Sequence, residues 1–196
     1  MKAIYISLRF FLLFTVITGI IYPMFVTGFA QLFFREKANG SLIYKENTVI
    51  GSRLAGQFSD NEKYFYSRPS AVNYQPLPSA GSNLGPTSAK LAEQVKTRRA
   101  EFIRINQLPD STSVPADMLY ASASGIDPHI SVLSARLQAG RIAKIRGFSP
   151  EQLVQLNTLI DKHTEQPVWH LLGETRINVL ELNLELDLMN TQTIKK

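Results

Sequence analysis

An uncharged, apolar run at residues 10–34 constrains this chain more than any other feature. The run reads FFLLFTVITGIIYPMFVTGFAQLFF and lies between Arg9 and the charged triplet Arg35-Glu36-Lys37. As an α-helix it would measure about 37 Å, and a bilayer core of about 30 Å needs about 20 apolar residues. The sequence therefore predicts one transmembrane helix over 10–34, a short tail over 1–9 and a soluble domain over 35–196.

A cleaved signal peptide is the alternative interpretation of this run. Lys2 and Arg9 would form its basic region, and Gly28-Phe29-Ala30 would be its small-residue cleavage site. The run exceeds the roughly 7–15 apolar residues of a signal peptide, and cleavage would leave Leu32-Phe33-Phe34 as an apolar stub. An uncleaved anchor is favoured, and both interpretations export the domain.

The flanks of the run predict its orientation. The tail carries Lys2 and Arg9 without an acid, whereas Glu36 dilutes Arg35 and Lys37 on the other side. Basic residues in short loops favour the cytoplasm, and long domains translocate largely regardless of their charge. We expect a single-pass protein of the cell inner membrane, with a cytoplasmic N-terminus and an extracytoplasmic C-terminal domain.

Composition excludes several classes of function for the domain. Residues 36–196 contain 18 Lys and Arg against 16 acids, so the basic surface of a nucleic-acid binder is absent. Without cysteine, the domain has neither disulfides nor thiolate metal sites. A hydrophobic core must stabilise it unaided.

The pattern of elements predicts an α+β domain that begins with short strands. Strand-forming runs are Ser41–Tyr44, Thr48–Ile50 and Tyr64–Tyr66. Residues 67–88 are rich in Pro, Gly and Ser and predict a long ordered loop, in which Tyr74, Leu77 and Leu84 would pack.

Helices are predicted for the rest of the domain. One spans 88–106 with Ser88 as its N-cap. Another begins at Asp127-Pro128 and runs to about Arg146, with Leu133, Leu137, Ile142 and Ile145 inward and Gly147 ending it. Ser149 and Gln152 form a capping box for the next helix. Residues 177–189 alternate like a strand but have helix-forming composition, and helix is favoured.

Catalytic motifs are missing from the sequence. Gly81-Ser82-Asn83-Leu84-Gly85 lacks the lysine of a phosphate loop. His129, His163 and His170 show no metal-ligand spacing, and no close pair of carboxylates suggests acid–base catalysis. We expect a non-enzymatic protein without a metal or cofactor of its own. The alternatives are a membrane-tethered hydrolase using Asp127, His129 and a serine, and a nucleotide-binding regulator.

Within the apolar run, small residues and a proline favour contact with another helix. Pro23 predicts a kink near Gly19–Pro23, because it lacks a backbone donor. Gly19 and Gly28 offer surfaces where a second helix could approach closely.

Several stretches, in this order, resemble the C subunit of the bacterial Kdp potassium-transporting ATPase. The resemblance spans nearly the whole chain. One departure is Val132, where that family usually has proline after Ser131; it changes only which residue caps the helix, Asp127 or Ser131. The stretches are TGIIYP (18–23), SRPSA (67–71), GSNLGPTS (81–88), VPADM (114–118), ASASGIDPHIS (121–131), Gln138 with Arg141-Ile142-Ala143, and NVLELNLELD (178–187).

This resemblance implies a non-catalytic subunit of a potassium-uptake complex. Its partners would be a channel-like potassium-translocating subunit, a P-type ATPase subunit and a small membrane subunit. The family's C subunit is described as an assembly factor and as a catalytic chaperone that raises the affinity of the ATPase subunit for ATP. A glutamine matching Gln138 is linked to that effect, so ATP would be a ligand of the complex rather than of this chain alone.

An exported domain cannot place Gln138 against ATP in the cytoplasm, so the topology favours an indirect effect. We expect the loop 67–88 and the turn 121–131 to dock on a partner. The residues expected at partner interfaces are Gly19, Tyr22, Pro23, Gly28, Arg68, Pro69, Ser70, Gly81, Ser82, Asn83, Gly85, Asp127, His129 and Arg141.

Overall fold

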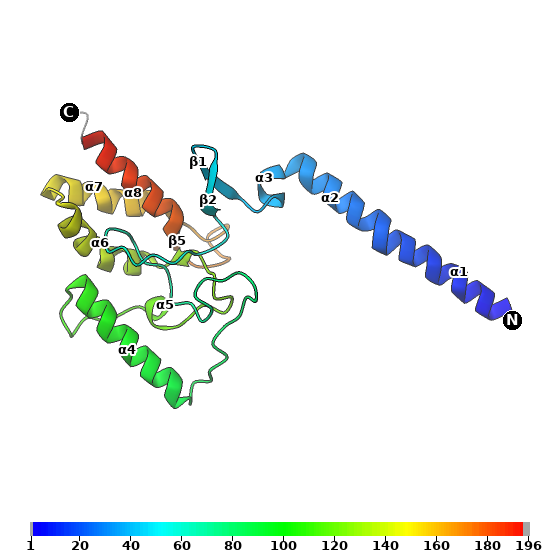
Figure 1. The fold of residues 1–196 in the computed structure, drawn as a ribbon, viewed down its shortest axis with the longest axis horizontal. Helices are drawn as coiled ribbons and strands as arrows, with labels where there is room; N and C mark the ends of the chain where they lie inside the picture. Colours follow the sequence, from blue (N-terminus) through cyan, green and yellow to red (C-terminus); the bar gives the residue numbers. More distant parts are fainter. Residues whose placement is uncertain (1, 194–196) are drawn as a thin grey trace. The chain divides into compact units, whose positions relative to one another are not determined.

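The computed structural model describes the backbone of residues 2–193 and the side chains of residues 2–189 (Figure 1). The first residue of the predicted tail and the last three of the predicted domain lie outside this range. The chain divides into two compact units, Met1–Ile43 and Tyr44–Lys196. Each unit is described by itself.

The first unit is dominated by one long apolar helix. It comprises α1 (Lys2–Val16), the π-helical turn η1 (Ile17–Ile21) and α2 (Tyr22–Phe33), and a single turn, α3 (Arg35–Ala38), follows. Over its 32 residues the helix is apolar and long enough to cross a membrane, and no part of its most apolar window is buried. One apolar N-terminal helix followed by an α+β domain is the predicted fold class.

Where a kink is predicted, near Gly19–Pro23, the helix contains the π-helical turn. Because Pro23 has no N–H, the Gly19 carbonyl loses its usual partner four residues ahead. The turn widens, and the Tyr22 N–H donates to the Ile17 carbonyl five residues back. Such π turns are typical of positions where an α-helix cannot close its regular hydrogen bonds.

Two small sheets form the β part of the structure. The first pairs β1 (Leu42–Lys45) with β2 (Thr48–Ser52), as predicted. The second has the antiparallel order β3-β5-β4, with Ile130 opposite Ile177 and Thr164 on its other side. Its strands are β3 (His129–Ile130), β4 (Thr164–Glu165) and β5 (Arg176–Asn178).

Helices pack around the second sheet and form the core. Helix α6 packs against α7 and α4, and α8 packs against α7 and β5 (Figure 1). Fully buried side chains where they meet include Ile142, Leu156, Ile160, Ile177 and Leu182. The helices are α4 (Ala89–Asn106), α5 (Ala116–Leu119), α6 (Val132–Arg146), α7 (Pro150–Lys162) and α8 (Val179–Thr193).

Most predicted helix ends are confirmed. Ser88 caps α4, and Gly147 ends α6 with a φ of 67°. Ser149 and Gln152 form both hydrogen bonds of the capping box at α7. The ambiguous stretch 177–189 ends β5 and then becomes α8, because the Asn178 carboxamide accepts from the N–H groups of Leu180 and Glu181 at 3.1 and 3.2 Å.

The start predicted for the helix after residue 126 is wrong. Asp127 does not cap it, and His129 lies in β3 rather than in a first helical turn. Ser131 is the N-cap of α6 and accepts from the Ser134 N–H at 3.2 Å. Leu133 was expected to face inward, but 56% of its surface is exposed.

The third predicted strand is also absent. Residues 64–66 belong to no strand, although Phe65 is fully buried. In the loop that follows, Tyr74 packs as predicted with its ring 6.3 Å from that of Phe58, whereas Leu77 is exposed.

Candidate functional site

The loop 67–88 and the turn 121–131 pack directly on each other. The Ser122 N–H donates to the Pro69 carbonyl at 3.2 Å. The hydroxyl of Ser70 donates to the Gly125 carbonyl at 2.6 Å, and that of Ser79 to the Ser124 carbonyl at 2.7 Å. We call these two segments the paired loops.

Small residues allow the close approach within the paired loops. Gly125 has a φ of +73°, and a Cβ there would lie 2.5 Å from the Val72 side chain. A Cβ on Gly81 would lie 2.9 Å from the Ala123 carbonyl oxygen. Real Cβ atoms essentially never approach so closely. Glycine at these two positions therefore allows the loop 67–88 and the turn 121–131 to pack against each other. Ser82, Asn83 and Gly85 follow Gly81 in the loop and are exposed.

An ion pair also links the paired loops, from Arg68 in one to Asp127 in the other. The Arg68 guanidinium lies 2.8 Å from Asp127 Oδ2. Asp127 Oδ1 accepts from the His129 N–H at 3.0 Å and faces its Nδ1 at 3.2 Å. Burial by itself raises the pKa of Asp127, but the hydrogen bonds from His129 and the charge of Arg68 outweigh burial and hold it at about 2.

The depressed pKa of Asp127 predicts a pH-dependent contribution to stability. Since the pKa of Asp127 lies below the ordinary value of 3.8 for this carboxyl, the contribution is complete above pH 3.8 and is lost as pH falls toward 2. At about 1.4 kcal/mol per pKa unit, it amounts to about 2 kcal/mol. Asp127→Asn should lower the free energy of unfolding by about that amount at pH 7 and by much less near pH 2.

Urea unfolding of the full chain in detergent between pH 7 and pH 2 measures this difference. The matched control is Asp110→Asn, which removes a largely exposed carboxylate paired with Arg99 at 3.3 Å and should change stability little at any pH. An Asp127→Asn cost that stays constant down to pH 2 would contradict the prediction.

The hydrolase alternative requires a serine hydroxyl that His129 can activate, and the serines that follow His129 are not arranged in this way. The nearest serine in sequence, Ser131, directs its hydroxyl to Asp117 Oδ1 at 3.2 Å and to the Ser134 hydroxyl at 2.9 Å. Ser134 in turn donates to both oxygens of Asp117 at 2.9 Å. Both hydroxyls are thus bound to a carboxylate rather than to the histidine that would have to activate them.

Gln138 lies in the core and holds the backbone of another segment. Its side chain is fully buried. Its Oε1 accepts from the Tyr66 N–H at 2.7 Å, and its Nε2 donates to the Tyr66 carbonyl at 3.3 Å. A glutamine committed on both ends to the protein backbone is not available to a ligand at the surface.

Asn183 on α8 makes the same pair of contacts one residue away. Its Oδ1 accepts from the Phe65 N–H at 2.8 Å, and its Nδ2 donates to the Phe65 carbonyl at 3.0 Å. Two side-chain amides thus take the place of neighbouring strands, which explains how the backbone groups of buried Phe65 and half-buried Tyr66 are paired without joining a sheet. We call Gln138 and Asn183 the amide clamp.

Arg141 completes this arrangement from the same helix as Gln138. Only 2% of its surface is exposed. Its guanidinium donates to the carbonyls of Glu62 and Tyr64, to Asn106 Oδ1 and to Gln138 Oε1, and it lies 4.4 Å from the centre of the Tyr66 ring. Burial lowers its pKa, although arginine stays charged in proteins. In this fold Arg141 is not available to a partner.

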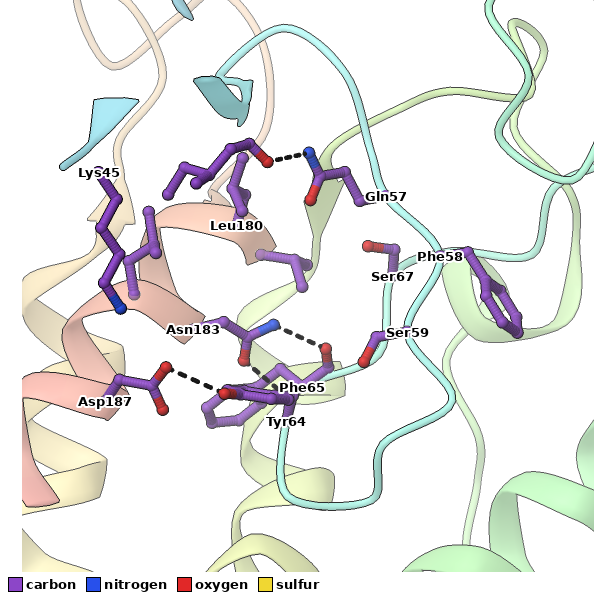
Figure 2. Close-up of a pocket in the computed structure, with 13 residues that line it drawn as sticks. Lys45, Gln57, Phe58, Ser59, Tyr64, Phe65, Ser67, Leu180, Asn183 and Asp187 are labelled. Carbon is purple, nitrogen blue, oxygen red and sulfur yellow. Dashed lines mark hydrogen bonds between the residues drawn. The ribbon is translucent and has the colours of Figure 1, made fainter. Parts of the chain in front are cut away.

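A cavity of about 320 Å³ borders Asn183 of the amide clamp (Figure 2). Asn183 binds the Phe65 backbone at its wall, and the Tyr64 hydroxyl donates to Asp187 at 3.0 Å. Burial and the Asp187 carboxylate raise the pKa of Tyr64. Lys45 is the one cation among the lining residues and Asp187 the one anion, so the cavity does not match the charge of a nucleoside triphosphate.

The remaining predicted contact residues lie on the apolar helix. Tyr22 is exposed, and a Cβ at Gly19 or Gly28 would meet no atom within 4 Å. Pro23 follows the π-helical turn. Sequence reasoning missed Asn183, Asn106 and Asp117; polar residues among the alternating leucines of 178–187 were the available signal for Asn183.

Comparison with known proteins assigns the family. The family model described as "K+-transporting ATPase, c chain" matches residues 4–188. Similar proteins are named Potassium-transporting ATPase KdpC subunit. That of Mycobacterium tuberculosis is 47% identical over 92% of this chain and 95% of its own. Those of Variovorax paradoxus and Polynucleobacter asymbioticus are 46% and 47% identical over 92% and 95% of this chain, and over 93% and 99% of their own. The chain belongs to the KdpC family, the c chain of K+-transporting ATPases.

Proposed function

We propose that this chain is a non-catalytic subunit of an ATP-driven potassium-uptake pump, which it helps to assemble and stabilise in the cell inner membrane. Family membership supports the pump. The observation that carries the role of the helix is that no part of its apolar window is buried within the chain. Those side chains need lipid or another helix around them, and the small surfaces at Gly19 and Gly28 favour a helix.

The channel-like potassium-translocating subunit is the proposed neighbour of the apolar helix. With the N-terminus in the cytoplasm, the domain lies outside and docks on the outer face of the same subunit. The paired loops support this assignment, since their hydrogen bonds and the Arg68–Asp127 ion pair hold Ser82, Asn83 and Gly85 at an exposed tip. A P-type ATPase subunit and a small membrane subunit complete the proposed complex.

The effect on ATP affinity is proposed to be indirect. Gln138 is buried, and both ends of its amide bind the backbone of Tyr66. A chaperone-like effect on the ATPase subunit would then pass through the membrane subunits as a coupling between distant sites. ATP would be bound by the ATPase subunit of the complex.

Replacing residues 10–34 by a leucine-rich span of equal length should test the role of the helix. We expect the partner subunits to be lost from gentle-detergent purifications and high-affinity potassium uptake to fall, because the small surfaces are gone. The matched control keeps Gly19, Tyr22, Pro23 and Gly28 in the leucine background and should restore both. A reporter fused after Lys196 and active only outside the cytoplasm checks that both variants keep the orientation.

Full assembly and full-affinity transport by the leucine-rich span would contradict the packing role. In that case the helix would serve only to hold the domain at the membrane.

A further inference from the structure

A tight turn at residues 166–173 presents the most exposed apolar side chains, outside the long loop, among the side chains that the structure describes in the second unit. Trp169 and Leu171 are 80% and 83% exposed, and Val168 and Leu172 are also exposed. The segment reads QPVWHLLG and contains no Asp, Glu, Lys or Arg. Surface hydrophobic residues scattered singly need no explanation, but a contiguous cluster marks an interaction site. We call this segment the tryptophan turn.

The backbone of the tryptophan turn is closed on itself. Val168 and Leu172 exchange hydrogen bonds, with the Val168 N–H donating at 2.9 Å and the Leu172 N–H at 3.0 Å. The His170 N–H donates to Pro167, and the Leu171 N–H to Val168. Trp169 and His170 are the two central residues of the turn that the Leu171–Val168 hydrogen bond closes, and both adopt the left-handed conformation. A fixed turn therefore carries the exposed side chains.

These internal hydrogen bonds favour lipid over a protein partner as the surroundings of the exposed side chains. In a hydrocarbon environment an unsatisfied backbone donor costs several kcal/mol, and four N–H groups of the turn are already satisfied within it. A surface that binds a protein partner more often has free polar groups around its apolar centre, which hydrogen-bond to the partner. Tryptophan is also the residue most typical of the boundary between headgroups and acyl chains.

The connection to the apolar helix keeps the domain at a membrane surface. Residues 34–43 join the helix to the domain, and a chain of that length spans about 35 Å at most. A single weak apolar contact gives only marginal membrane binding by itself. When the domain is already tethered, the high local concentration of lipid makes the same contact effective.

We propose that the tryptophan turn inserts into the headgroup–acyl boundary of the bilayer that the helix spans, as a second membrane contact of the domain. The proposal rests on the membrane anchoring inferred above, but not on any partner subunit. It assigns Trp169, Leu171 and Leu172 to lipid, and it fixes which side of the domain faces the membrane.

The chain has a single tryptophan, so its fluorescence reports on the turn without any labelling. The full chain, without partner subunits, is reconstituted into phosphatidylcholine vesicles with or without bromine on the acyl chains near the headgroup. We expect brominated lipid to quench most of the Trp169 emission, and emission in unbrominated vesicles to be shifted to the blue relative to the chain unfolded in urea.

Two aspartate variants provide the comparison. Leu171→Asp places a charge in the turn and should abolish the quenching by brominated lipid and shift the emission to the red. Val154→Asp places the same charge at an exposed apolar position on α7 and should leave quenching unchanged. Circular dichroism of both variants checks that the fold is retained.

Flotation of the vesicles separates the two inferences. A chain that does not float with the vesicles overturns the anchoring by the helix. A chain that floats, but whose Trp169 emission is unaffected by brominated lipid, overturns the insertion of the turn. Shielding of Trp169 that occurs only in the assembled pump would likewise overturn insertion and assign the turn to a protein partner.

Discussion

Replacing Arg141 with alanine should lower the free energy of unfolding of the domain by about 3–5 kcal/mol, the cost typical of breaking a buried charged network. The substitution removes the donors to the Glu62 and Tyr64 carbonyls and the partner of Asn106. It also leaves a cavity beneath the Tyr66 ring, against which the guanidinium packs. For a domain of this size the midpoint of thermal unfolding should fall by roughly 10 °C, measured by circular dichroism of the full chain in detergent.

Two further variants show whether the hydrogen bonds or the volume matter. Arg141→Met fills much of the space but cannot donate, so it should remain strongly destabilising. The control is Arg136→Ala on the same helix, whose exposed pair with Asp161 should contribute less than about 1 kcal/mol. Equal effects of Arg136→Ala and Arg141→Ala would contradict the network described here.

Substitutions in the amide clamp should cause the second large loss of stability. Gln138→Leu and Asn183→Leu each leave a buried N–H and carbonyl without partners, so each should cost about 2–4 kcal/mol of stability. The two side chains hold adjacent residues, Tyr66 and Phe65, from different helices. If Gln138 influences ATP only through the fold, both variants should weaken the apparent ATP affinity of the pump in proportion to the stability they lose.

Unfolding of each variant and the ATP dependence of hydrolysis by the purified complex test this together. Gln155→Leu, at an exposed position of α7, is the control and should change neither quantity. A loss of ATP affinity in Gln138→Leu without a matching loss in Asn183→Leu would indicate that Gln138 acts on the nucleotide directly.

Features with local causes could be predicted from the sequence. The caps at Ser88, Gly147 and Ser149 depend on residues within four positions of each other. The apolar helix follows from an uninterrupted run. Pro23 indicated where its regular hydrogen bonding is interrupted, although a kink rather than a π-helical turn was predicted there. The stretches SRPSA and ASASGID were found as candidate site segments, although nothing in their sequence showed that they contact each other.

Features with distant causes could not be predicted. Tyr64–Tyr66 has the composition of a strand, but its hydrogen-bond partners lie 72 and 118 residues ahead, on two helices. Asp127-Pro128 has the chemistry of a helix start, yet Asp127 pairs with Arg68, 59 residues back. In both cases a tertiary contact replaces the local structure that the residue types favour.

The contacts of Phe65 have a consequence for the order in which the domain folds. Residues 62–66 are made early in synthesis, but Asn183 and Asp187, which bind Phe65 and Tyr64, are 118 and 123 residues later. Loops of this length close slowly. Gln138 and Arg141 of α6 can bind Tyr66, Glu62 and Tyr64 earlier, but the Phe65 backbone has no side-chain partner until α8 has been made. The domain therefore completes its fold only after α8 has been made, and loss of α8 by truncation or proteolysis would first remove the partners of Phe65 and Tyr64.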